Sequence, residues 1–105
     1  MILVETPVFT RQINGLLSLE SYRALQLALV DDPVRGATVR GSGGLRKMRW
    51  QGSGRGRRGG IRVIYFWIRD RDMILLLLAY PKKEQDDLTP KQLKVLRQVV
   101  EEELR

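Results

Sequence analysis

Two apolar runs joined by a short polar turn occupy residues 61–80, and their sequences are IRVIYFWI (61–68), RDRD (69–72) and MILLLLAY (73–80). The first run is rich in β-branched and aromatic residues, which is typical of a strand. The second run is apolar throughout, which is typical of a strand that is buried on both faces. We therefore expect two strands here, joined by the polar turn at residues 69–72, with the second strand at the centre of the sheet.

Two helices are predicted on the N-terminal side of these strands. Pro7 suits the first turn of a helix, because the N–H that proline lacks would be unpaired there, and this helix is expected to run to about Asn14 and to end at Gly15. The Ser18 hydroxyl is placed to cap a second helix that ends before Pro33. Three apolar or aromatic residues of this second helix share one face: Tyr22, Leu25 and Leu29.

The C-terminal segment has the pattern of a capped helix. Residues 89–92, TPKQ, provide a capping hydroxyl, a first-turn proline and a reciprocal glutamine. Apolar side chains then recur on one helical face, so this helix should dock on the sheet. With strands at residues 2–4 and 45–50, the order becomes β-α-α-β-β-β-α. We therefore predict one α+β domain over residues 1–105, with a small antiparallel sheet flanked by two N-terminal helices and one C-terminal helix.

The composition excludes several classes of site. The 105 residues include no cysteine and no histidine, so disulfides, zinc fingers, Ser-His triads and histidine bases are excluded. The apolar run 73–79 is far shorter than the roughly 20 residues that a membrane-spanning helix needs. The N-terminus lacks the charged start and cleavage site of a secretory signal. We expect a soluble, cytoplasmic protein.

Positive charge is concentrated in the middle of the chain. The net charge is +7, but residues 33–69 contain ten Lys or Arg and no carboxylate. Such a field on a small scaffold favours a polyanionic partner, and nucleic acid is the leading candidate. The segment 51–60 holds five glycines and three arginines, which is too many glycines for a regular element. It is not a phosphate-binding P-loop, because no Gly-Lys-Ser/Thr follows it.

Five basic residues form a candidate RNA-cleaving cluster. Lys47 and Arg49 share a strand face by alternation, and Arg62 lies on that face if the two strands pair. Lys82 and Lys83 follow the last strand and complete a basic pocket at one end of the sheet. RNA cleavage needs removal of a 2′-hydroxyl proton, stabilisation of the phosphorane and protonation of the leaving oxygen. Without histidine, crowded lysines are candidates for the proton transfers, and arginine suits stabilisation of the phosphate charge.

Four pieces of sequence carry a family resemblance: residues 43–49 (GGLRKMR), the glycine-arginine loop, residues 60–66 (GIRVIYF) and residues 80–88 (YPKKEQDDL). In this order and spacing they resemble toxins of the RelE/ParE superfamily, and the HigB-like branch most closely. The resemblance implies the RelE-like microbial RNase fold and the toxin part of a type II toxin–antitoxin system. It also implies a metal-independent mRNA endonuclease that needs no cofactor, cuts transcripts in the ribosomal A site by 2′-hydroxyl attack and so inhibits translation.

The resemblance also implies partners. The toxin would be held inactive by a cognate HigA-like antitoxin with a helix-turn-helix domain. Operator DNA would be reached only through that antitoxin, mRNA and ribosomal RNA would be direct partners, and no membrane would be involved.

Site residues are carried over by position. Lys47 and Arg49 match the basic pair of the family's second core strand, and Arg62 matches the arginine that opens the next strand and stabilises the transition state. Lys82 and Lys83 match the basic pair after the last strand. We therefore predict a catalytic set of Arg62, Lys47, Arg49 and Lys82, and an RNA- or ribosome-binding set of Arg46, Arg55, Arg57, Arg58 and Lys83. The chain departs from the family in having no aromatic after Tyr80 and a proline at position 81, where glycine is common.

Structural interpretations stand beside these functional ones. Arg46 points away from Lys47, so a structural pairing with a carboxylate is favoured for it. The three loop arginines either are a solvated surface or steer toward RNA phosphates. Packing is favoured over base stacking for the four aromatics Trp50, Tyr65, Phe66 and Trp67. The acids Glu84, Asp86 and Asp87 are expected to favour the N-terminus of the last helix, with metal ligation as the alternative.

Three functional hypotheses remain at the level of sequence. The first is the ribosome-dependent mRNA endonuclease. The second is a non-catalytic RNA- or ribosome-binding module that blocks translation by occupancy. The third is a degenerate toxin that acts only as the partner of its antitoxin.

Overall fold

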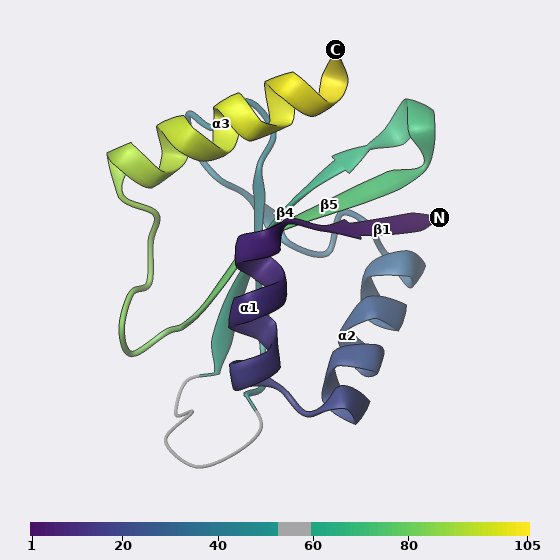
Figure 1. The fold of residues 1–105 in the computed structure, drawn as a ribbon, viewed down its shortest axis with the longest axis vertical. Coiled ribbons are helices and arrows are strands. Elements are labelled where there is room, and N and C mark those ends of the chain that lie inside the picture. Colours follow the sequence, from purple (N-terminus) through teal and green to yellow (C-terminus); the bar gives the residue numbers. More distant parts are fainter. Residues whose placement is uncertain (53–59) are drawn as a thin grey trace.

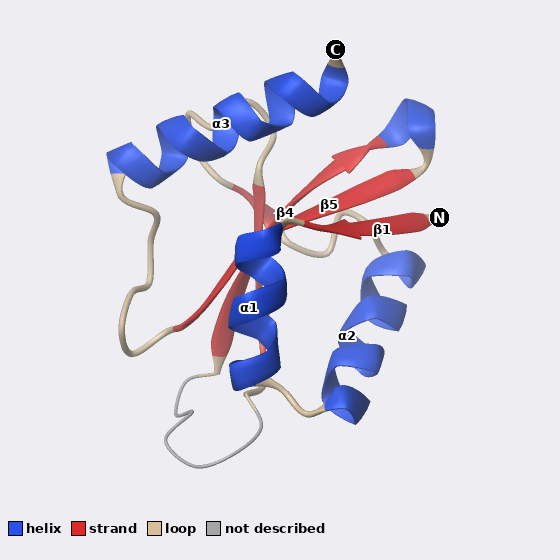
Figure 2. Ribbon diagram, in the orientation of Figure 1, coloured by secondary structure: helices blue, strands red, loops and turns tan. Residues whose placement is uncertain are grey.

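The computed structural model describes residues 1–52 and 60–105 and shows an α+β fold, as predicted. In these described residues, three helices pack against one sheet, as Figures 1 and 2 show. The elements, in chain order, are β1 (Ile2–Glu5), α1 (Pro7–Leu16), α2 (Leu19–Asp31), β2 (Ala37–Thr38), β3 (Arg46–Trp50), β4 (Ile61–Ile68), a 3-10 turn (Arg69–Arg71), β5 (Met73–Pro81) and α3 (Pro90–Leu104).

The five strands form one mixed sheet in the order β1-β5-β4-β3-β2. The pairs from β2 to β5 are antiparallel, but β1 runs parallel to β5, with Ile2 beside Met73. The sequence predicted antiparallel pairing throughout, and the parallel edge strand is the difference. The two-residue strand β2 lies in a segment that was expected to be a loop, because two residues give no periodicity to recognise.

Side-chain caps define the helix ends. Ser18 accepts a hydrogen bond from the Ser21 N–H, as predicted for α2, and Thr89 and Gln92 form the predicted capping box of α3. Helix α1 continues to Leu16, beyond the predicted end at Gly15, because Leu16 is itself buried in the core. Among the helices of the described residues, none has the length and apolar character that crossing a bilayer requires.

Two apolar clusters lie on opposite faces of the sheet. One cluster joins α1 and α2 to the sheet and includes Phe9, Leu25 and Tyr65. The other joins α3 to the sheet and includes Ile64 and Leu96. We call the second side of the sheet the α3 face. Successive strand residues point to opposite faces, so the alternation of each strand decides which of its side chains reach this face.

A β-bulge in β5 shifts that alternation. Ile64 pairs with Leu78, but the next residue of β4, Tyr65, pairs with Leu76, so Leu77 is an extra residue in β5. Before the bulge, Ile74 and Leu76 belong to the α1/α2 cluster, whereas Tyr80, after it, belongs to the α3 cluster. Strict alternation from Ile74 would have pointed Tyr80 at the opposite face.

The segment before β3 is held to the sheet by the Tyr65 hydroxyl. The Tyr65 side chain is fully buried; its hydroxyl accepts the Gly36 N–H and donates to the Pro33 carbonyl, each over 2.8 Å. Burial raises the pKa of Tyr65 above its usual value. A Cβ on Gly36 would lie 2.9 Å from the backbone of Lys47, so only glycine allows this close approach.

Candidate active site

Three basic residues meet on the α3 face at one end of β3 and β4. Arg49 of β3 lies directly opposite Arg62 of β4, and Lys47 lies opposite Ile64. The next strand, β5, contributes Tyr80, which pairs with Arg62 in the register. Like charges facing each other across two strands destabilise a sheet unless they are compensated, so this end of the sheet needs anions.

Asp86 provides one of these anions. The Arg62 side chain is only 3% exposed, and its Nε donates to Asp86 Oδ1 over 3.1 Å. Asp86 itself remains 53% exposed, so its carboxylate faces solvent. Removing a guanidinium from water is expensive without a charged partner, and Asp86 supplies that partner for Arg62.

Lys47 and Tyr80 bind the same short segment, Asp86 and its neighbour Asp87. The Lys47 Nζ lies 2.7 Å from Asp87 Oδ1 and also donates to the Asp86 carbonyl over 3.2 Å. The hydrogen bond and positive charge of Lys47 lower the pKa of Asp87. The Tyr80 hydroxyl donates to the Asp86 carbonyl over 3.2 Å, and burial together with the charges of Asp87 and Asp86 raises the pKa of Tyr80 to about 12. Tyr80 is therefore a proton-bearing donor at neutral pH.

We call residues 82–88, between β5 and α3, the acidic loop. The sequence predicted that its acids favour the N-terminus of α3; instead Asp86 and Asp87 pair with Arg62 and Lys47. The described residues bring together no group of three acids that could hold a metal. Sequence reasoning missed Tyr80 and the two aspartates as parts of the site. The available signal was that Tyr80 ends the last apolar run and that the two aspartates follow it closely, at the sheet end to which Lys82 and Lys83 were assigned.

The other predicted site residues have different surroundings. Arg49, Lys82 and Lys83 are exposed, and in the described part of the chain no ion pair engages them. Arg46 donates to the Gly36 carbonyl over 2.7 Å, so its partner is a backbone oxygen and not the carboxylate we expected. The predicted RNA-contacting residues Arg55, Arg57 and Arg58 lie outside the described residues.

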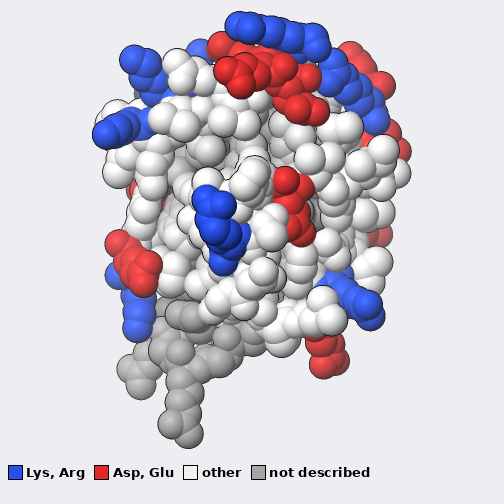
Figure 3. All heavy atoms as spheres, in the orientation of Figure 1, with Lys and Arg blue, Asp and Glu red and all other residues white. Residues whose placement is uncertain are grey.

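The aromatic side chains serve the core, as predicted. Tyr65 is buried, and Trp50 and Trp67 pack against the α1/α2 cluster while Phe66 packs against the α3 cluster. Figure 3 shows the side of the molecule that carries α1, where cations and carboxylates lie together along α3 and few charges surround α1. This side offers mixed or little charge, in contrast to the basic cluster at the end of β3 and β4.

Comparison with known proteins assigns the fold to a family. The family model described as the RelE toxin of the RelE / RelB toxin-antitoxin system matches residues 34–104. The chain belongs to the RelE toxin family. Among solved structures, it resembles a free-state, double arginine-to-alanine mutant of E. coli toxin RelE with a TM-score of 0.57 and 14% identity, over 81% of this chain and 86% of that chain. The resemblance to RelE toxins drawn from the sequence is confirmed, and it implies an antitoxin partner.

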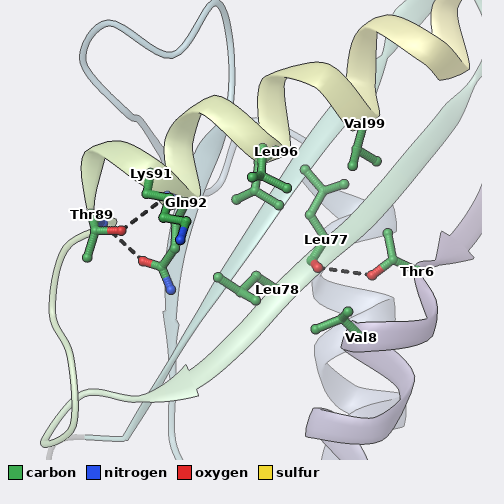
Figure 4. Close-up of a pocket in the computed structure, with 10 residues that line it drawn as sticks. Thr6, Val8, Leu77, Leu78, Thr89, Lys91, Gln92, Leu96 and Val99 are labelled. Atoms are coloured by element: carbon green, nitrogen blue, oxygen red, sulfur yellow. Dashed lines mark hydrogen bonds between the residues drawn. The ribbon is translucent and has the colours of Figure 1, made fainter.

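This RelE-family chain also has an apolar groove beside α3 (Figure 4). The groove has a volume of about 410 Å³ and lies between α3, β5 and the start of α1. The bulge residues Leu77 and Leu78 line it together with Val8 and Leu96, and Lys91 stands among the lining residues. The Thr6 hydroxyl donates to the Leu77 carbonyl over 3.0 Å, which fixes the start of α1 beside the groove.

Proposed function

We propose that this RelE-family toxin is a ribosome-dependent endoribonuclease that cuts mRNA in the ribosomal A site and so inhibits translation. The observation that supports it best is the meeting of Lys47, Arg49 and Arg62 on one sheet face, with Tyr80 across from Arg62. Lys82 and Lys83 follow directly at the same end of β5. Five cations at one end of the sheet are what a polyanionic backbone with a charged transition state requires.

In the proposed reaction, the 2′-oxygen attacks the adjacent phosphorus while the bond to the 5′-oxygen breaks. The products are a 2′,3′-cyclic phosphate and a 5′-hydroxyl, and one proton leaves the 2′-oxygen while another reaches the 5′-oxygen. Arg62 stabilises the charge on the phosphorane, because its fork matches two phosphate oxygens and always stays protonated. Arg49 binds a flanking phosphate, and Lys47 and Lys82 supply the proton transfers.

The remaining basic residues have supporting roles in the proposal. Lys83 and the loop arginines Arg55, Arg57 and Arg58 contact phosphates of mRNA or ribosomal RNA, which steers binding without touching the reacting atoms. Arg46 holds the Gly36 carbonyl, and so supports the segment that lies against Lys47. All the charges that this mechanism uses are side chains of the protein.

The test is primer extension on an mRNA in translating extract, with and without ribosomes. We expect ribosome-dependent breaks with the wild type, and at least about a 100-fold loss with Arg62→Ala, which is the effect of removing one stabilising donor. Arg62→Lys keeps the charge without the fork and should also lose most activity. The matched control is Arg23→Ala, an exposed arginine of α2. Inhibited translation with intact mRNA would instead favour the occupancy hypothesis, and absence of any inhibition would favour the degenerate toxin.

For the partner, we propose a HigA-like antitoxin with a helix-turn-helix domain, through which alone the toxin reaches operator DNA. An acidic amphipathic segment suits both the basic net charge and the apolar groove. Val95, which lines the groove and is 49% exposed, offers the test. Val95→Asp should abolish co-purification with the co-expressed antitoxin while translation is still inhibited. Leu27→Asp, which changes an exposed residue of α2, is the control and should keep the complex.

A further inference from the structure

The acidic loop places two carboxylates on the donors that the proposed RNA phosphates need. Asp86 Oδ1 lies 3.1 Å from Arg62 Nε, and Asp87 Oδ1 lies 2.7 Å from Lys47 Nζ. The Lys47–Asp87 length is ordinary for a charge-assisted hydrogen bond and the Arg62–Asp86 length is slightly longer, and a phosphate oxygen would use the same donors. The carboxylates therefore show where this face of the sheet binds anions.

Solvent reaches the carboxylates far more easily than it reaches the cations. Arg62 is 3% exposed and Lys47 is 23% exposed, whereas Asp86 and Asp87 are 53% and 83% exposed. An RNA strand that approaches this site meets two negative charges before it meets Arg62. The single N–H of Arg62 Nε can donate to a phosphate only if Asp86 gives up its place there.

We propose that Asp86 and Asp87 stand in for two RNA phosphates in the free protein, and that RNA binds by replacing them at Arg62 and Lys47. This inference rests on the proposed function, and it adds how the site is kept closed to other anions. No covalent bond changes in this step; one set of charge-assisted hydrogen bonds is exchanged for another.

The anchoring of the acidic loop allows such an exchange. At its start, the Glu84 and Gln85 N–H groups both bond to the Pro81 carbonyl, and the Gln85 amide exchanges hydrogen bonds with the amide of Gln92 in the first turn of α3. These anchors involve no basic side chain. The Asp86 and Asp87 carboxylates bond to Arg62 and Lys47. The Asp86 carbonyl accepts from Lys47 and Tyr80, and the Asp87 carbonyl accepts from the Gln85 amide. The two carboxylates can therefore leave Arg62 and Lys47 while the bonds of Gln85 to Pro81 and Gln92 stay in place.

The experiment measures binding of a short 2′-O-methyl RNA, which cannot attack its own phosphate, by fluorescence anisotropy at low salt. Asp86→Asn and Asp87→Asn keep the shape of each side chain and remove one charge. The matched control is Glu84→Gln, which removes one charge from an exposed residue of the same loop. We expect each aspartate variant to bind about threefold or more tighter than the control, and the double variant to bind about tenfold tighter than wild type. Affinities equal to or weaker than that of Glu84→Gln would overturn the inference.

A second measurement on the wild type covers the case in which Asp86→Asn disturbs the fold. In nitrogen-edited NMR spectra, the Nε–H signal of Arg62 should shift when the same RNA is added, and amides 86–88 should exchange faster with solvent. RNA binding that leaves both unchanged would refute replacement. The primer-extension assay separates the two proposals. Breaks in mRNA without tighter RNA binding by the aspartate variants would support the nuclease and refute the replacement of Asp86 and Asp87 by phosphates. Tighter binding without breaks would support that replacement in a non-catalytic site.

Discussion

Removal of the Tyr65 hydroxyl tests how the segment before β3 is held. In Tyr65→Phe, the buried Gly36 N–H loses its acceptor, which costs about 1–3 kcal/mol for an unsatisfied group. The Pro33 carbonyl loses its donor too, but this bond is only partly buried, so it adds about 0.5–1 kcal/mol. We expect a loss of about 1.5–4 kcal/mol from a total of about 5–15 kcal/mol for a domain of this kind. The melting temperature should fall by about 6–30 °C.

Urea unfolding followed by the fluorescence of Trp50 and Trp67 measures this loss. The matched control is Tyr80→Phe, which removes the same atom. Its acceptor, the Asp86 carbonyl, also bonds to Lys47 Nζ and so keeps a partner, and the expected loss stays within about 1 kcal/mol. If Tyr65→Phe were as stable as Tyr80→Phe, with the same dependence on urea, the reasoning about the buried Gly36 N–H would be wrong.

Three further predictions concern the cap of α3 and two titrating groups. Thr89→Ala removes the acceptor of the Gln92 N–H and should cost about 1 kcal/mol in urea unfolding, whereas Thr89→Ser should keep the cap. Lys47 lowers the pKa of Asp87 from its ordinary 3.8, so the stability that this pair contributes is present above pH 3.8 and is lost as the pH falls through the lowered pKa. The difference in stability between wild type and Asp87→Asn should therefore shrink in acid. The pKa of Tyr80 is raised from 10.0 to about 12, so the stability that the protonated hydroxyl contributes is complete below pH 10 and is lost toward pH 12. Tyr80→Phe should therefore lose less stability than wild type between pH 10 and pH 12, and an equal loss would count against the raised pKa.

The sequence predicted the elements with strong local signals. The strands at 61–68 and 73–81 follow from their apolar runs, and α3 follows from its capping box. The parallel pairing of β1 with β5 was missed, because a four-residue strand contains no information about which neighbour it will join. The extension of α1 to Leu16 was missed because tertiary burial outweighs the helix-ending tendency of Gly15.

The part of the site that lies on strands could be predicted from the alternation of side chains. Lys47 and Arg49 share a face by alternation, and β4 pairs with β3 so that Arg62 joins them. The partners of these cations could not be predicted in the same way, because the acidic loop has no periodicity and its path depends on contacts with three strands. The sequence therefore indicated which charges gather, while the tertiary structure shows that two of them are already engaged.

The extra residue at Leu77 makes the length of β5 a functional property of the chain. A single deletion between residues 75 and 79 would remove the bulge, and each later side chain of β5 would then point to the opposite face of the sheet. Tyr80 would enter the α1/α2 cluster. Composition would barely change, yet the aromatic hydroxyl that holds the acidic loop would be lost from the cationic side. When this chain is aligned with relatives or its C-terminal part is exchanged with theirs, a one-residue gap here therefore matters more than many substitutions.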